Sequence, residues 1–256
     1  MRKAQLVATV LLLCCGCTVF VGVARATQIV ALEAGFSPDQ LGAPTTIDFG
    51  FRVSSPVPGA IPSPVVGVDL YLPAGMGLAT STLGLAVCQP RTLLELGLAG
   101  CSANARVGFG RALGELHVEG EVIDEAARVQ ALLGPNVNGH EQVLFYVEGE
   151  APVAAELVFP GELLPSTSPA FSGYLRTSVP IVTAWNDGPD ISVTRFSSSL
   201  GPRGLTYFRH VNGFVVPFKP RGIAVPTSCP ADGFMFRADL TFLDGSRAIA
   251  RHAVPC

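Results

Sequence analysis

The stretch Cys229-Pro-Ala-Asp-Gly-Phe-Met-Phe-Arg-Ala-Asp-Leu-Thr-Phe-Leu-Asp-Gly-Ser-Arg-Ala-Ile-Ala-Arg-His-Ala-Val-Pro-Cys256 decides the fold class. From Phe234 to Phe242 every second residue is apolar, which is the period of a strand with one buried face. Asp244-Gly245 supplies the left-handed backbone of a tight turn, so residues 247–254 are predicted as the return strand. The stretch therefore predicts a β-hairpin, and the cysteine at each end predicts a disulfide that staples it.

The chain before this hairpin repeats the signature of strands separated by turns. Its 28 glycines and 21 prolines, counted over the whole chain, fall between alternating segments. We expect an all-β fold, an antiparallel β-sandwich, built as one large unit or as two intimately packed ones with an internal boundary near residues 161–170. The expected strands before the hairpin cover residues 45–53, 65–72, 106–111, 142–149, 157–160, 171–182 and 191–200.

Two segments depart from this pattern. Residues 91–97 have the apolar spacing of one helical turn and end at a glycine. Residues 124–133 are ambiguous, because Asp124 could cap a helix that Gly134 stops. Since Val129, Ala131 and Leu133 alternate, a strand is favoured there.

The amino terminus predicts export. Arg2 and Lys3 precede an uncharged run over residues 4–24, and Ala24-Arg25-Ala26 matches a signal-peptidase site, so residues 1–26 are expected to be cleaved before Thr27. Two alternatives remain open: the run is long enough to stay as a membrane anchor, or Cys17 is lipidated. All three place residues 27–256 outside the cytoplasm, with membrane contact only through the amino-terminal segment.

Four cysteines lie beyond residue 26: Cys88, Cys101, Cys229 and Cys256. An even number of cysteines in an exported chain predicts disulfides, and four allow three pairings. The sequential pairing Cys88–Cys101 and Cys229–Cys256 is favoured, because each pair then brackets a local unit. Zinc is not expected, since no Cys-x-x-Cys spacing and no nearby histidine pair occur, and no other metal or cofactor is predicted.

The charges are unevenly distributed. Without residues 1–26, which hold three bases and no acid, the formal charge falls from −3 to −6. Half of the twenty carboxylates lie in residues 115–162, whereas residues 195–221 hold five bases and no acid. This pattern argues against a nucleic-acid binder with a uniform basic face. The basic segment alternates with aromatic residues, so Arg203 and Arg209 are candidates for binding an anionic cell-wall or surface polymer, unless the arginines simply face solvent.

A second candidate site is the loop that begins at the only tryptophan. Trp185 could stack on a sugar, and Asp187 and Asp190 could supply oxygen ligands to a cation. Asn, Asp, Gly and Pro are also the usual residues of turns, so a simple turn is favoured over a binding loop for Asn186-Asp-Gly-Pro-Asp190.

Signals for catalysis are weak. The repeated tetrapeptide Val-Glu-Gly-Glu places Glu119 with Glu121, and Glu148 with Glu150, on one face of a strand. A glycosidase needs carboxylates across a cleft, so a solvated face is favoured over an acid–base pair or a calcium site. No Gly-x-Ser-x-Gly motif occurs, and both disulfides would leave no free thiol. No catalytic residue is assigned.

Four further features of the sequence are Leu72-Pro-Ala-Gly-Met76, Cys101 with Arg106-Val-Gly-Phe-Gly110, Phe145-Tyr-Val-Glu-Gly-Glu150 and the terminal hairpin. Together they resemble the motifs of exported, β-rich, disulfide-bonded actinobacterial proteins of uncharacterised function. The resemblance implies an exported disulfide-bonded β protein and names no activity. We therefore expect a non-catalytic secreted or cell-surface protein with a binding or structural role. The alternative is a secreted carbohydrate-active hydrolase on the same scaffold, and the sequence does not indicate an oligomeric state.

Overall fold

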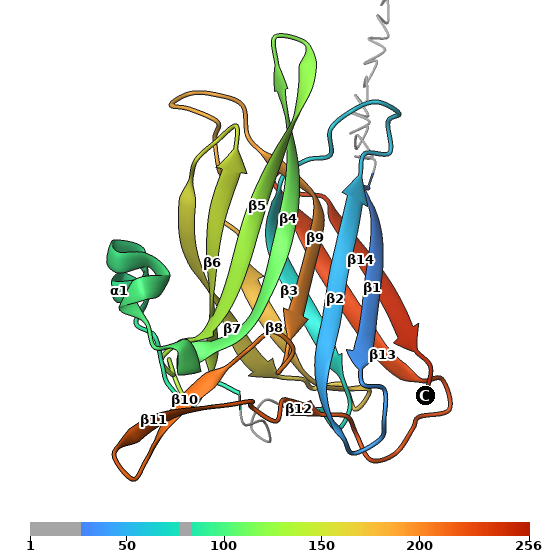
Figure 1. Ribbon diagram of the computed structural model, residues 1–256. Helices are drawn as coiled ribbons and strands as arrows, with labels where there is room; N and C mark the ends of the chain where they lie inside the picture. Colours follow the sequence, from blue (N-terminus) through green and yellow to red (C-terminus); the bar gives the residue numbers. More distant parts are fainter. Residues whose placement is uncertain (1–26, 77–82) are drawn as a thin grey trace, which may run out of the picture.

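The computed structural model describes residues 27–76 and 83–256, so the predictions for residues 1–26 lie outside the described residues. The chain is all-β and antiparallel, as expected (Figure 1). Its strands are β1 Ile29–Ser37, β2 Pro44–Ser54, β3 Val65–Pro73, β4 Arg106–Val118, β5 Glu121–Leu133, β6 Gln142–Ala151, β7 Glu156–Pro165, β8 Phe171–Ser178, β9 Ser192–Leu200, β10 Tyr207–Val211, β11 Phe214–Phe218, β12 Ile223–Ala224, β13 Phe234–Phe242 and β14 Arg247–Val254. The helical segments are α1 Pro90–Leu96, η2 Gly97–Gly100 and η3 Ala103–Ala105.

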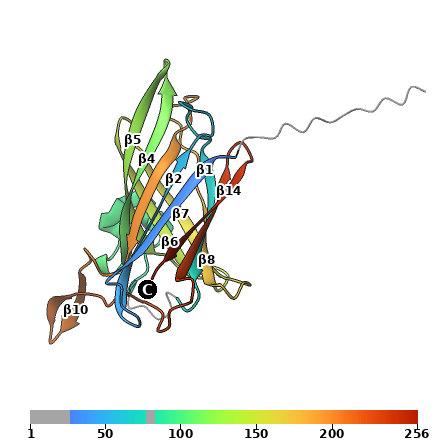
Figure 2. The same ribbon diagram turned by 90° about the vertical axis from the view of Figure 1, so that its right-hand side faces the viewer.

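One hydrogen-bonded sheet contains twelve of these strands. Its order is β1-β2-β9-β4-β5-β6-β7-β8-β3-β13-β14, with β12 attached to β2. The two end strands, β1 and β14, lie side by side, so the sheet curls into a nearly closed, barrel-like wall (Figures 1 and 2). The two packed sheets of a sandwich are not confirmed, because the hydrogen bonding runs through a single sheet.

The terminal hairpin is confirmed. Along β13 the side chains of Phe234, Phe236, Ala238, Leu240 and Phe242 are buried, and the residues between them are half-exposed. β13 pairs with β14 on one side and with β3 on the other, which places it inside the sheet. The ring of Phe36 on β1 contacts those of Phe234 and Phe236, with centroids 5.4 and 5.8 Å apart. The hairpin therefore packs against the opposite edge of the sheet.

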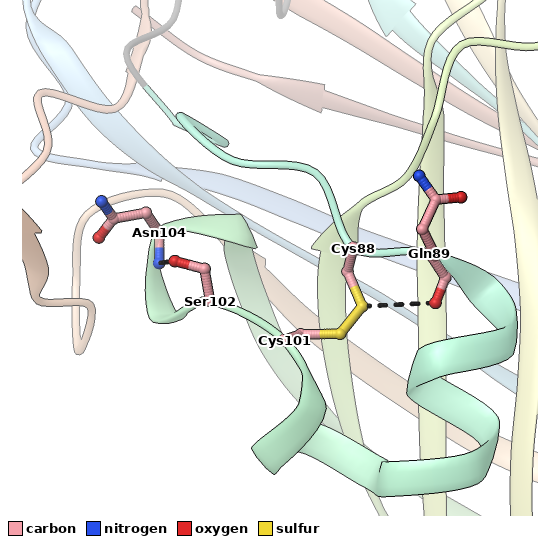
Figure 3. Close-up of a disulfide and its surroundings, with 5 residues drawn as sticks. All are labelled: Cys88, Gln89, Cys101, Ser102 and Asn104. Carbon is pink, nitrogen blue, oxygen red and sulfur yellow. Dashed lines mark hydrogen bonds between the residues drawn. A yellow bond between two sulfur atoms is a disulfide. The ribbon is translucent and has the colours of Figure 1, made fainter.

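The short helix α1 covers the outer face of β5 and β6, in agreement with the helical turn expected at residues 91–97. Leu93 is fully buried there against Leu132 and Leu144. The Cys88–Cys101 disulfide ties the two ends of this helical segment together, and the Ser102 side chain accepts a hydrogen bond from the Asn104 backbone N–H at the start of η3 (Figure 3). The second disulfide joins Cys229 to Cys256, so both expected pairings are present.

Three further expectations concern the strand at residues 124–133, the end of the strand that begins at Phe171, and the boundary near residues 161–170. Residues 124–133 belong to strand β5, as favoured. β8 ends at Ser178 rather than at residue 182, and Pro180, which has no N–H to donate to a ladder, follows closely. Residues 161–170 form the end of β7 and the turn into β8, and both strands belong to the same sheet.

Candidate functional site

The barrel-like wall encloses an apolar cavity of about 160 Å³. Its lining comes from strands on all sides of the sheet, and includes Leu32, Phe51, Leu70, Val129, Phe145 and Phe196. A buried hole of about 150 Å³ with a similar aliphatic and aromatic lining stays dry and binds benzene. The cavity is therefore large enough for a small apolar molecule.

The cavity reaches the surface at one end. Val153 in the β6–β7 connection and residues 180–182 in the β8–β9 connection line it, and Ile181 among them is 44% exposed. Both connections lie at the upper end of the barrel in Figure 1. Backbone hydrogen bonds hold the longer connection in place, from Ile191 N–H to Val182 C=O at 2.8 Å and from Ala184 N–H to Pro189 C=O at 3.0 Å. The mouth is thus formed by ordered backbone.

Glu125 is the one charged residue among the described residues that line the cavity. Its side chain is 5% exposed, and its Oε2 accepts a hydrogen bond from the backbone N–H of Val153 at 2.8 Å. Its other oxygen, Oε1, is buried without a hydrogen-bond partner in the part of the chain that the structure describes. Buried polar atoms are nearly always partnered, so an orphan oxygen in an apolar cavity is a feature that needs an explanation.

The local backbone explains how Glu125 enters the interior. Along β5 the inward positions are Glu125, Ala127, Val129 and Ala131, two residues apart. A bulge in the neighbouring strand β6 opposes Ala127 with Gly149 and Ala126 with Ala151. A Cβ at Gly149 would lie 3.0 Å from Glu125 Oε1 and 2.3 Å from the Val153 carbonyl oxygen, so only glycine leaves room for this carboxylate.

The predicted ligand loop is an ordinary turn in this structure. Trp185 is 54% exposed, Gly188 N–H donates to the Trp185 carbonyl at 2.9 Å, and Asp187 adopts a positive φ of 60°. Asp190 forms an isolated β-bridge with Thr183, which closes the loop. The loop belongs to the β8–β9 connection and so lies at the same end of the barrel as the cavity mouth.

The two predicted basic residues are engaged with their own neighbours. Arg203 forms a salt bridge with Asp48 and donates to Ser199 Oγ at 3.0 Å. Arg209 lies with its guanidinium carbon 5.3 Å from the centroid of the Phe218 ring, on the β10–β11 hairpin. That hairpin projects at the lower end of the barrel in Figure 1, so the structure does not bring Arg209 and the tryptophan loop together.

The four repeat glutamates do not form a two-sided site. Glu119 occupies the β4–β5 turn with a φ of 52°, and Glu121 begins β5. Glu148 pairs across the sheet with Glu156, and Glu150 forms a salt bridge with Arg128 at 3.2 Å. Within residues 27–76 and 83–256, no group of three His, Cys, Asp or Glu side chains could hold a metal ion. The same residues contain no helix with the length and apolarity needed to cross a membrane.

A buried tyrosine lies on the outer face of β6, beneath the helical segment. Burial, together with the nearby carboxylates of Glu148 and Glu156, raises the pKa of Tyr146 to about 12. The residue is 3% exposed. Burial beneath the helical segment is the main cause, and the acidic side chains on β6 and β7 act in the same direction.

Arg111 and Arg195 lie on the outer wall without an ion-pair or hydrogen-bond partner among the described residues. Arg195 on β9 is opposite Arg52 on β2, and Arg111 on β4 is opposite Ser197 on β9. They border a shallow groove over β2, β9 and β4, which Gly50 also lines. Arg52 itself pairs with Glu33 at 3.4 Å.

Glu125 was not identified from the sequence as a site residue, although a signal for it exists. The alternation of Val129, Ala131 and Leu133 was read only as evidence for a strand. Extended back from Val129 by two and four residues, it places Ala127 and Glu125 on the same inward face. A carboxylate in register with a buried face is the pattern that marks this site.

Comparisons with known proteins bring nothing further, since no protein-family model, no curated protein and no solved structure matches the chain.

Proposed function

We propose that this protein is an exported, non-catalytic binding protein that holds a small, mainly apolar ligand inside its barrel-like sheet. The observation that carries the proposal is the cavity of about 160 Å³, whose lining is almost entirely aliphatic and aromatic and whose mouth lies at one end of the barrel. Ligand pockets are typically concave and apolar with a few polar groups, and this cavity has that composition.

The absence of a second carboxylate facing Glu125 supports a non-catalytic role over the alternative of a carbohydrate-active hydrolase. Glycoside cleavage uses two carboxyl groups on opposite sides of the scissile bond. Among the described residues that line the cavity, Glu125 is alone, and the other polar side chain is the hydroxyl of Thr177. An apolar lining also offers few partners for the hydroxyl groups of a sugar.

Export is supported by the two disulfides, because disulfides persist in oxidising compartments and are rare in the cytosol. Residues 1–26 supply the signal in this proposal, whether they are cleaved, retained as an anchor or lipidated. The resemblance to exported actinobacterial β-rich proteins points to the same location, at the cell surface or in the medium.

The cavity proposal is tested with benzene as the probe, by ligand-induced thermal shift and by NMR of the exported chain. Ala127→Leu adds a bulky side chain to the cavity lining, and the adjacent Ala126→Leu adds the same group beside the cavity lining, on the outward face of β5. We expect Ala127→Leu to abolish benzene binding and Ala126→Leu to leave it unchanged. Absence of binding to the unaltered protein, or equal binding by both variants, would overturn the proposal.

A second candidate role is weak binding of an anionic surface polymer, favoured by the unpartnered bases Arg111 and Arg195. The bases first expected to do this, Arg203 and Arg209, are engaged by Asp48 and the Phe218 ring. The groove between Arg52, Arg111 and Arg195 is also lined by the serines at 197–199 and by two carboxylates, which are paired with Arg52 and Arg203. Exposed bases attract polyanions in a way that salt screens.

This role predicts retention on isolated cell wall that falls as the ionic strength rises. The double variant Arg111→Glu/Arg195→Glu should abolish retention, whereas Arg203→Glu/Arg209→Glu should reduce it only modestly. Retention that ignores both salt and the first double variant would exclude the groove as the binding surface.

A further inference from the structure

The orphan oxygen of Glu125 restricts what the cavity can hold, if the proposed apolar binding function is correct. The residue is nine-tenths buried or more, with Oε2 satisfied by Val153 N–H and Oε1 without a partner among the described residues, in a cavity whose lining is mainly apolar. A buried carboxylate oxygen without a donor carries a desolvation cost that a hydrogen bond removes. We infer that the ligand carries a hydrogen-bond-donating head group, an amine or an alcohol on a small apolar body, and that this head binds Glu125 Oε1.

The position of Glu125 defines how such a ligand would lie. Val153, which lines the mouth, also donates to Glu125, so the carboxylate sits near the open end of the cavity. The polar head would therefore remain near the mouth, and the apolar body would extend inward toward the rings of Phe51, Phe145 and Phe196. Because these rings line the inner part of the cavity, the apolar part of the ligand is expected to be aromatic or short and branched.

Within residues 27–76 and 83–256, no group substitutes for this donor. The backbone of Gly149 lies beside Oε1, but its N–H donates to the Ala155 carbonyl at 2.8 Å. Arg128, the base closest along β5, is one of the alternating outward residues and pairs with Glu150. A water molecule could fill the position, but a ligand that displaces it keeps the hydrogen bond only if it brings a donor of its own.

The negative charge of the Glu125 carboxylate determines which ligand head groups the cavity favours. A carboxylate in an apolar site is favourable when it is paired with a cation or donor, and a second anion beside it is repelled. The inference therefore excludes carboxylate-headed ligands such as fatty acids, and it ranks amines and alcohols above hydrocarbons of the same shape. Charge-assisted hydrogen bonds are the stronger kind, so the amine ranks first.

Four probes of similar size separate these cases: toluene, benzyl alcohol, benzylamine and benzoate. Measured by calorimetry on the exported chain, the affinities are expected to fall in the order benzylamine, benzyl alcohol, toluene, with a gap of at least about tenfold between the first and the last, corresponding to about 1.4 kcal/mol. Benzoate should bind least. Failure of all four to bind would overturn the proposed function itself, whereas toluene binding as tightly as the amine, or benzoate binding best, would overturn only the inference about Glu125.

Variants at Glu125 and at a carboxylate outside the cavity complete the test. Glu125→Leu should remove the preference for benzylamine and leave toluene binding in place, whereas Asp124→Leu, at the exposed neighbouring position on β5, should leave the preference intact. If Glu125→Leu fails to fold because Val153 N–H loses its acceptor, Glu125→Gln keeps an acceptor there and should lower the benzylamine affinity more than that of benzyl alcohol. A preference that survives both Glu125 variants would overturn the inference.

Discussion

The hydroxyl of Tyr207 donates a hydrogen bond to the carbonyl oxygen of Arg106 at 2.5 Å. The hydroxyl oxygen of Tyr207 in turn accepts a hydrogen bond from the backbone N–H of Gly84 at 2.8 Å, and the Tyr207 side chain is fully buried. The pair ties the start of the β10–β11 hairpin to the start of β4, although the hairpin forms a two-stranded sheet of its own. One phenol thus anchors a projecting element to the barrel.

Replacing this phenol by Phe should therefore destabilise the protein. Tyr207→Phe keeps the ring but leaves two buried backbone groups without a partner, which costs about 1–3 kcal/mol in the free energy of unfolding. Denaturant melts provide the measurement, with Tyr174→Phe on the half-exposed outer face as the control. Equal losses in the two variants would show that the Tyr207 hydrogen bonds carry no special weight.

The terminal hairpin predicts unequal effects on its two faces. Phe236→Ala removes a fully buried ring and should cost roughly 3–5 kcal/mol. Met235→Ala, on the half-exposed face next to it, should cost clearly less. The same melts compare the two variants, and similar losses would mean that both faces of β13 are buried to the same degree.

The phenol beneath α1 predicts a pH dependence. Since burial raises the pKa of Tyr146 to about 12 from its usual 10.0, the unfolded chain loses this proton first as the pH rises. The contribution of the neutral phenol to stability is fully present below pH 10.0 and is lost as the pH approaches about 12. Difference absorbance of phenolate between the unaltered protein and Tyr146→Phe checks the titration. A midpoint near the ordinary value would contradict it.

The two disulfides should differ in their resistance to reductant. Cys229 and Cys256 are both exposed, whereas Cys88 is 2% exposed beneath the helical segment. Access controls thiol exchange, so mild reduction should open Cys229–Cys256 first. Mass mapping after timed alkylation gives the order. Unreduced protein that contains free thiols, or Cys88 joined to Cys229, would contradict the pairing itself.

The parts of this fold that were predictable from the sequence are those with local causes. The alternation at 234–242, the Asp244-Gly245 turn and the helical turn before Gly97 each depend on neighbours in the chain. The placement of β9 between β2 and β4, and of β3 between β8 and β13, depends on contacts between distant segments. No local pattern specifies these, so the curl of one sheet, rather than a sandwich, was not foreseen.

The candidate site shows the same division. The exposed loop at Trp185 and the bases Arg203 and Arg209 have conspicuous composition, yet the structure gives them turn, salt-bridge and ring contacts. Glu125 is inconspicuous in the sequence because it is one of ten carboxylates in residues 115–162. It becomes distinctive only once β6 pairs with β5 and places Gly149 and Val153 beside it.

The neighbouring positions of β1 and β14 have a consequence for how the protein is made. Strand β1 is synthesised long before its neighbour β14. Until β13 is also present, Phe36 lacks its contacts with the rings of Phe234 and Phe236. Bringing such distant segments together carries an entropic cost and slows folding. The wall therefore closes only after residues 247–254 have been synthesised, so truncation before β14 would leave β1 without its neighbouring strand and expose the interior of the sheet to aggregation or proteolysis.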